Sequence, residues 1–151
     1  MVKYILGDLF KSEAEVYTCT VNTVGVMGCG IAFEFKRRYP NNYLDYRSYC
    51  KSGRLQTGNI FVTETRKRHG PRWIVNFPTK RHWRNPSELD WIRDGLWSLR
   101  KWLDDYRVES IALPKLGCSN GGLDWYDVRD LIESILGPIE TDCLVYLTRQ
   151  Y

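Results

Sequence analysis

Two glycine-rich segments, each between an apolar strand pattern and a helix pattern, constrain the fold of this chain more than any other feature. Residues 22–30 read NTVGVMGCG, and residues 114–122 read PKLGCSNGG. Glycine lets the backbone approach a ligand closely, and the helix that follows offers free N–H groups and a positive dipole. Neither segment matches GxxxxGK[ST] or GxGxxG. Two converging loops therefore suit a diphosphate, and an ordinary nucleoside-triphosphate or dinucleotide oxidoreductase site is disfavoured.

Strand and helix patterns alternate through most of the chain. A stripe from Leu89 to Tyr106, at spacings of three and four residues, predicts the clearest helix. Pro40 is expected to end the helix that starts near Gly30, and Asn42 to cap the next one. The expected strands are residues 2–6, 16–22, 58–65, 72–77, 110–113 and 143–147. The order of these elements predicts an α/β fold with a mixed sheet between two layers of helices.

Length and composition favour one globular domain. The chain has 151 residues, 43% of them hydrophobic, and no apolar run approaches a membrane span. The first ten residues do not resemble a secretory signal. The five scattered cysteines argue against a disulfide framework or a zinc site. We therefore expect a cytoplasmic protein that needs no metal or cofactor and does not contact a membrane.

Basic residues cluster although the net charge is only +4. One cluster is Arg66-Lys67-Arg68, and another is Lys80-Arg81-His82-Trp83-Arg84. Cations beside an aromatic ring can hold phosphate while the ring stacks on a base. Arg81, His82, Trp83 and Arg84 are therefore the candidate DNA-binding residues, and a solvated surface is the alternative.

Four motifs together resemble a known family. They are GDLF at residues 7–10, VNTVGVMGCGIAFEFK at 21–36, NFPTKRHW at 76–83 and LGCSNGGLDW at 116–125. The chain resembles a macrodomain, and more narrowly the DarG family of DNA ADP-ribosyl glycohydrolase antitoxins. The resemblance implies a single macrodomain over residues 1–151. Its fold would be a three-layer α/β/α sandwich around a mixed, mostly parallel sheet of about six strands.

The resemblance also implies an ADP-ribose site at the carboxyl ends of the strands. Asp8 would accept a hydrogen bond from the adenine amino group, with Leu9 and Phe10 beside the base; its alternative role is to cap a turn. Asn22 would bind the distal ribose, or else satisfy the backbone of its own turn. The remaining expected ligand-binding residues come from the two loops: Gly25, Val26, Met27, Gly28, Gly30, Leu116, Gly117, Cys118, Ser119, Asn120 and Gly121.

Lys80 and Asn22 are the expected catalytic residues. Lys80 follows an expected strand and a Pro-Thr turn, and the family's lysine acts there at the distal ribose. Its amine could act as an acid towards the leaving base or as a nucleophile at the anomeric carbon, and the sequence does not separate these routes. On composition alone, a lysine is usually solvated.

The chain departs from the family pattern at the loops. Cys29 stands where a lysine is common, and Lys115 could return positive charge from the opposite loop. The second loop lacks the aspartate of the related terminal ADP-ribose glycohydrolases. Cys29 and Cys118 precede helices, where a thiolate would be stabilised, but the sequence positions no histidine to activate either of them.

These features predict a hydrolase that removes ADP-ribose from DNA, on thymidine bases in single strands. A reader module that binds ADP-ribose without cleaving it is one alternative. Hydrolysis of protein-linked ADP-ribose or of ADP-ribose 1″-phosphate is another. The expected partners are ADP-ribose and ADP-ribosylated single-stranded DNA, and the resemblance raises a DarT-type toxin as a further partner. DarG proteins carry an additional C-terminal region for which this chain has no room. We expect a monomer.

Overall fold

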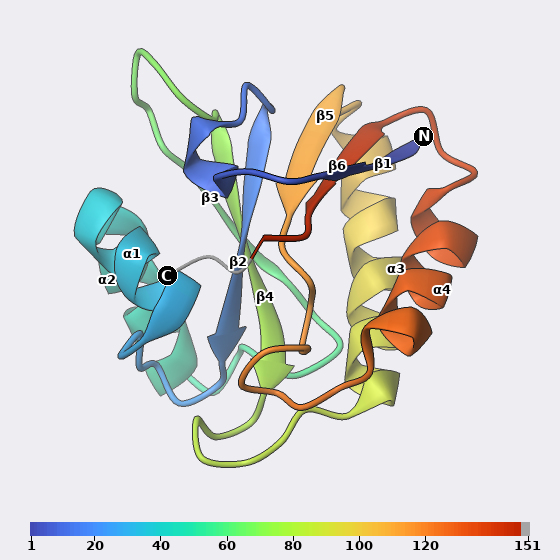
Figure 1. The fold of residues 1–151 in the computed structure, drawn as a ribbon. Helices are drawn as coiled ribbons and strands as arrows, with labels where there is room; N and C mark the ends of the chain where they lie inside the picture. The colour runs from blue at the N-terminus through green and yellow to red at the C-terminus, as the bar shows by residue number, and fades with distance from the viewer. Residues whose placement is uncertain (149–151) are drawn as a thin grey trace.

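A six-stranded sheet forms the centre of the molecule in the computed structural model, which describes residues 1–148. The strand order is β1-β6-β5-β2-β4-β3, and only β3 runs antiparallel to its neighbour. The carboxyl ends of the parallel strands thus lie at the same end of the sheet, which we call its carboxyl edge (Figure 1). The strands are β1 (Val2–Ile5), β2 (Val16–Asn22), β3 (Phe61–Glu64), β4 (Trp73–Lys80), β5 (Ser110–Leu113) and β6 (Asp142–Tyr146).

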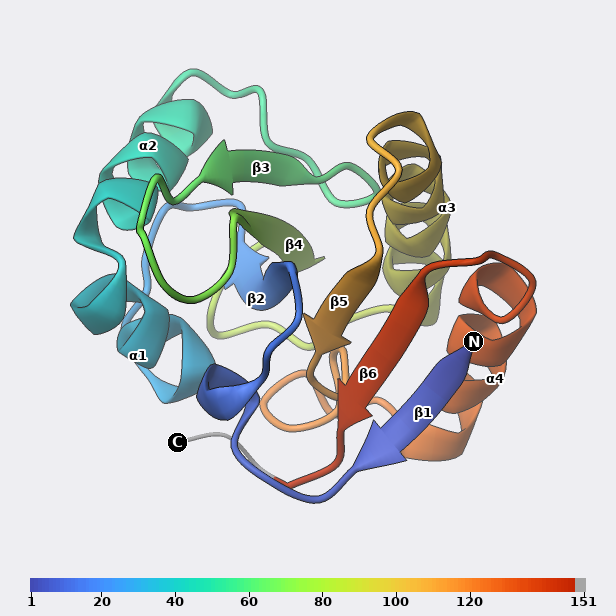
Figure 2. The same cartoon turned by 90° about the horizontal axis from the view of Figure 1, so that it is seen from above.

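Helices cover both faces of this sheet. A helical pair, α1 (Gly30–Arg38) and α2 (Pro40–Lys51), lies on one face, and α3 (Leu89–Asp105) and α4 (Trp125–Leu136) lie on the other (Figures 1 and 2). A short 3-10 helix, η1 (Leu9–Lys11), follows β1. The predicted three-layer fold with a mixed, mostly parallel six-stranded sheet is confirmed. No helix in the described part of the chain is long and apolar enough to cross a membrane.

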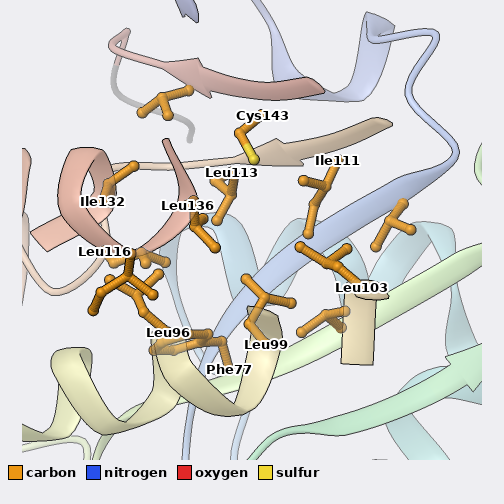
Figure 3. Packing of buried hydrophobic residues seen from close by; sticks show 14 of the residues in the cluster. Phe77, Leu96, Leu99, Leu103, Ile111, Leu113, Leu116, Ile132, Leu136 and Cys143 are labelled. Carbon is orange, nitrogen blue, oxygen red and sulfur yellow. The ribbon is translucent and has the colours of Figure 1, made fainter. Parts of the chain in front are cut away.

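The apolar stripe of α3 forms one half of the core. Ile92, Leu96, Leu99 and Leu103 are fully buried against the sheet and α4 (Figure 3). Each such side chain contributes about 1.5–3 kcal/mol when it leaves water. Gly95 lies on the same helix, and a Cβ there would overlap the ring of Phe77. This close approach fixes α3 against β4, the strand that ends at Lys80.

The second helix differs from its predicted start. Pro40 does not simply end α1, because it occupies the first turn of α2, where a helix needs no N–H donor. Asn42 therefore lies inside α2, where it is buried, and does not cap the helix. Its amide bonds reciprocally with Asn76 of β4 at 3.1 and 2.8 Å, and it accepts from Thr63 at 2.6 Å. These polar contacts attach α2 to the sheet.

The strand that carries Lys80 is longer than predicted. β4 extends through Pro78 and Thr79 to Lys80, so the expected Pro-Thr turn is wrong. β3 pairs with β4 only as far as Asn76, and is itself shorter than the predicted 58–65. Beyond Asn76 the β3 side of β4 is an edge, where a proline in a strand is tolerated. On the other side the register with β2 shifts, and Asn22 lies opposite Lys80.

Candidate functional site

A cavity of about 600 Å³ opens at the carboxyl edge of the sheet. The loops that follow β2, β4 and β5 surround it, and they gather at the lower edge of the sheet in Figure 1. Many of the predicted site residues line it: Asn22, Val26, Gly28, Gly30, Lys80, Trp83, Gly117, Cys118, Ser119, Asn120 and Gly121. The fold thus brings the two glycine-rich loops and Lys80 into one site.

The first loop is organised by the side chain of Asn22. Its Oδ1 accepts hydrogen bonds from the backbone N–H groups of Val24 and Gly25 at 3.1 Å and of Val26 at 3.3 Å. Its Nδ2 donates to the carbonyl of Val26 at 2.9 Å. The buried hydroxyl of Tyr46 donates both to the Asn22 carbonyl and to Oδ1. Asn22 therefore satisfies the turn backbone, which was the alternative role, while it still borders the cavity.

The second loop is organised by backbone packing. Gly117 has a φ of +71°, and a Cβ there would lie 2.8 Å from Cδ1 of Leu123. A Cβ on Gly121 would overlap the carbonyl of Gly117 and the hydroxyl of Ser87. The Ser87 N–H donates to the Gly121 carbonyl at 3.0 Å. A side chain at Gly121 would push the loop off its support, whereas at Gly117 the positive φ is the stronger constraint, because the end of the Leu123 side chain can move.

The two loops meet across the cavity mouth. The amide of Asn120 donates to Sγ of Cys29 at 3.6 Å. Cys29 is the N-cap residue of α1, and its side chain makes no cap hydrogen bond. The start of this helix borders the cavity, because Gly28, Cys29, Gly30 and Ile31 line it. Such a helix start is suited to a phosphate group.

Lys80 lines the same cavity and lies opposite Asn22 at the end of β4. Its Nζ donates to the carbonyl of Trp83 at 3.2 Å, and its own carbonyl accepts from the N–H of Thr23 at 3.1 Å. The turn that presents the Trp83 carbonyl is closed by the N–H of Arg84, which donates to Nδ1 of His82 at 3.1 Å. The amine is thus held at the rim by a structured turn and connected through the backbone to the first loop.

The four predicted DNA-binding residues diverge. Trp83 lines the cavity and is 46% exposed, with the His82 ring stacked at 4.9 Å and the Arg84 guanidinium over it at 4.5 Å. Arg81 instead lies over the ring of Trp91 at 4.7 Å and donates to Thr57 at 3.4 Å. A base that stacks on Trp83 must accommodate two existing neighbours.

Several of the predicted ligand-binding residues do not line the cavity and instead pack behind its wall. Leu9, Met27 and Leu116 are at most 1% exposed, so their side chains lie in the core rather than in the cavity wall. Gly25 packs against α2, and a Cβ there would lie 3.3 Å from Cβ of Cys50. Asp8 caps η1, because its carboxylate accepts from the N–H of Phe10 at 2.9 Å. The ring of Phe10 packs on Phe35.

Sequence reasoning missed part of the wall. The missed residues come from strand ends and the start of α1: Thr20, Val21, Ile31, Ala32, Thr79, Pro114, Tyr146 and Thr148. β6 pairs with β5, so its carboxyl end lies beside the second loop. The parallel-sheet rule would have indicated this position, since ligands bind at the carboxyl ends of the strands.

Cys118, the cysteine of the second loop, is not a stabilised thiolate. Burial raises the pKa of Cys118 to about 11, and its thiol donates to the carbonyl of Leu116 at 3.4 Å. The expectation of a stabilised thiolate was therefore wrong for Cys118, because desolvation outweighs the nearby Lys115 charge. Within residues 1–148, no group of three or more His, Cys, Asp or Glu side chains could hold a metal ion.

Comparison with known proteins places this geometry in a family. The Macro domain model matches residues 19–132. The curated DNA ADP-ribosyl glycohydrolase of Thermus aquaticus is 45% identical over 140 residues, which are 93% of this chain and 39% of that protein. The chain thus spans about two fifths of the length of this curated relative.

Solved structures agree. The macrodomain of Mycobacterium tuberculosis DarG is 44% identical, with a TM-score of 0.93 and 98% of both chains covered. Thermosipho africanus DarTG in complex with ADP-ribose is 34% identical, with a TM-score of 0.89, and the match covers 97% of this chain and 41% of that one. The curated Thermosipho africanus relative is a fusion of a DNA ADP-ribosyl transferase with a glycohydrolase.

Proposed function

Because this chain belongs to the macrodomain family and is 44% identical to a DarG macrodomain over nearly its whole length, we propose that it removes ADP-ribose from DNA. The single observation that carries the proposal is that Lys80 lines the same cavity as two glycine-rich loops and a helix start. The solved DarTG structure with ADP-ribose supports that ligand. We include in the proposal that residues 1–151 form a single macrodomain.

The cavity fits a ligand of this size and charge. A volume of about 600 Å³ lies within the range of ~300–1,000 Å³ that small-molecule sites occupy. The diphosphate would lie between the two loops, beside the N-terminus of α1. The adenine would lie towards Asp8 and Phe10, and the distal ribose near Asn22 and Lys80. In this arrangement Asn22 acts through the loop that it holds.

The residues of the cavity wall favour Lys80 as the group that performs the reaction. Of the described residues that line the cavity, none is aspartate or glutamate, and the ionisable cations are Lys80 and Lys115. A carboxylate-assisted step therefore has no group to perform it at this wall. As a general acid, the Lys80 ammonium would give its proton to the departing base as water attacks the anomeric carbon. As a nucleophile, the neutral amine would form a bond to that carbon while the carbon–base bond breaks and the departing base takes a proton from water. A second water would then hydrolyse the ribose–lysine bond, which releases ADP-ribose and restores the amine.

The source of the substrate follows from the fused relative. We propose that a DarT-type toxin, which modifies thymidine bases in single-stranded DNA, supplies the substrate of this domain. A transferase joined to a glycohydrolase in one Thermosipho africanus protein supports this pairing. We also infer a cytoplasmic location, which fits the free state of Cys19, Cys29, Cys50, Cys118 and Cys143.

A direct comparison of substrates tests the proposal. Single-stranded DNA with ADP-ribosylated thymidine and a protein with ADP-ribosylated carboxylates are incubated separately with the domain, and released ADP-ribose is measured. Release from the DNA alone is the expected result. Release from the protein alone would assign the domain to protein-linked ADP-ribose. Binding without release from either substrate would make it a reader.

A further inference from the structure

Positive charge is concentrated on one layer of the molecule. Residues 23–72 contain ten lysines and arginines and three acidic residues, a net charge of +7, so the rest of the chain carries −3 of the total of +4. This segment forms α1 and α2 on one face of the sheet, the edge strand β3, and the connections between them (Figures 1 and 2). On the opposite side, α3 and α4 together contain four cations and seven acidic residues. We call the surface formed by the ten cations of residues 23–72 the basic face.

The cations of the basic face are exposed, and some of them are supported by aromatic rings. Nine of the ten are exposed, and Arg38 is partly exposed. Lys36 lies over the ring of Tyr43, and Lys67 lies over the ring of Tyr39, each at 4.6 Å. Nζ of Lys67 also donates to the carbonyl of Arg38 at 2.9 Å, which ties the β3–β4 loop to the end of α1. Cations supported in this way lose less side-chain freedom when they bind an anion.

The basic face is continuous with the rim of the cavity. Gly25 of the first loop packs on α2, and a Cβ there would lie 3.7 Å from Cα of Arg47. Lys51 ends α2 one turn later, and Arg54 follows it. Arg47, Lys51 and Arg54 are exposed. A strand that leaves the cavity past the first loop therefore meets these three cations first. The clusters at 36–38 and 66–68 lie together at the carboxyl end of α1, since Lys67 bonds to the Arg38 carbonyl there.

The surface beside Trp83 is much less positive. Arg81 and Arg84 are followed by Glu88, Asp90 and Asp94 at the start of α3. Arg93 pairs with both of these aspartates, at 3.0 and 3.3 Å. The basic face also holds ion pairs, of Glu34 with Arg37 and Arg38 and of Glu64 with Arg66 and Arg72. Its cations outnumber its carboxylates, so phosphate groups are attracted to this face more strongly than to the side of α3.

We propose that the basic face binds the phosphate backbone of single-stranded DNA, with Arg47, Lys51 and Arg54 as the contacts nearest the cavity. The inference rests on the proposed function, because it supplies the path of the strand whose modified base reaches Lys80. Single-stranded DNA carries one charge per nucleotide, so a broad row of cations fits it without reading sequence. Its occupant is this DNA rather than an acidic protein, because the row begins at the rim of the cavity.

Charge removal tests the proposal without touching the cavity. The triple variant Arg47→Gln, Lys51→Gln, Arg54→Gln is compared with a control triple, Lys3→Gln, Lys101→Gln, Arg107→Gln, which removes the same charge elsewhere. Binding of a fluorescent, unmodified 20-nucleotide oligothymidine is measured by anisotropy from 50 to 200 mM salt. Each phosphate contact adds ~0.7 to the logarithmic salt slope. The test variant should therefore lose about 2 in slope and about 100-fold in affinity near 0.1 M salt.

Two further measurements separate this inference from the proposed function. Calorimetry with free ADP-ribose should give the same affinity for the parent and both triple variants, since none of the six residues lines the cavity. Cleavage of ADP-ribosylated thymidine mononucleoside should also be unchanged, and its absence in all three proteins would count against the proposed function alone. Equal loss of DNA affinity in both triple variants would overturn the inference. So would failure of the parent domain to bind DNA at 50 mM salt, which would leave the face to an acidic protein.

Discussion

The two loops of the cavity are built by opposite means. The first is held by a buried side chain, since Asn22 accepts three backbone N–H groups and Tyr46 supports it from α2. The second is held by the absence of side chains, because Gly117 and Gly121 pack where no Cβ fits. Hydrogen bonds can be weakened one at a time, whereas a steric overlap forces the backbone to move. The first loop should therefore tolerate conservative change better than the second.

The largest effect is expected for Gly121→Ala. The added methyl group overlaps the carbonyl of Gly117, which is backbone and cannot rotate away. Overpacking against backbone lies at the upper end of its usual range, about 3 kcal/mol, and the displaced loop should also lose ADP-ribose affinity. Denaturant unfolding and calorimetry measure both losses. Gly28→Ala, which meets only Cγ1 of Val26 at 3.5 Å, is the matched control and should be nearly silent in stability.

A smaller loss is expected for Asn22→Ala. It leaves the buried hydroxyl of Tyr46 and the turn N–H groups with one acceptor fewer, at a cost of about 1–3 kcal/mol. Tyr46→Phe removes only the donor and should cost about 0.5–1.5 kcal/mol. Thermal or denaturant unfolding of the two variants gives the comparison. If Tyr46→Phe proved as costly as Asn22→Ala, the side-chain scaffold described for the first loop would be incorrect.

The smallest effect is expected in the rates at which the two loop cysteines, Cys29 and Cys118, are alkylated. Cys29 of the first loop is exposed, whereas burial raises the pKa of Cys118 in the second to about 11. At pH 8 only about one Cys118 thiol in a thousand is the reactive thiolate, and this fraction grows about tenfold per pH unit up to its pKa. Iodoacetamide followed by mass spectrometry should modify Cys29 first. Faster modification of Cys118 at pH 8 would contradict the desolvation of this thiol.

Much of the fold followed from local patterns, but the site followed only in part. The stripe of α3 is periodic, and β2 and β5 are short, mostly buried runs bounded by loop residues, so the sequence was enough to predict them. The start of α2 was placed too late, at Asn42, because a proline that follows the end of one helix is also compatible with the first turn of the next. The end of β4 was predicted too early for a similar reason, because Pro78 suggested a turn. A proline is tolerated in this strand because β3 pairs with β4 only as far as Asn76.

Within the loops, the sequence predicted which segments surround the cavity but not which side chains face it. Loops have no period, so Met27 and Leu116 could be assigned to the ligand although both are buried. The basic face was divided between separate clusters in the sequence, because only the fold places residues 36–38 beside residues 66–68. Arg81 stays a predicted DNA contact, and the sequence did not indicate that its guanidinium lies over the ring of Trp91.

The central claim is that Lys80 performs the chemistry while the loops hold the ligand, and single-turnover cleavage by Lys80→Ala tests it most directly. The substrate is single-stranded DNA with ADP-ribosylated thymidine, and ADP-ribose affinity is measured in parallel. The variant should bind ADP-ribose nearly as well as the parent and cleave at least ~100-fold more slowly, since the amine acts mainly in the transition state. Lys80→Arg, which keeps the charge but is a poor acid and nucleophile, should be similarly slow. Cleavage by Lys80→Ala at the parent rate would contradict the account.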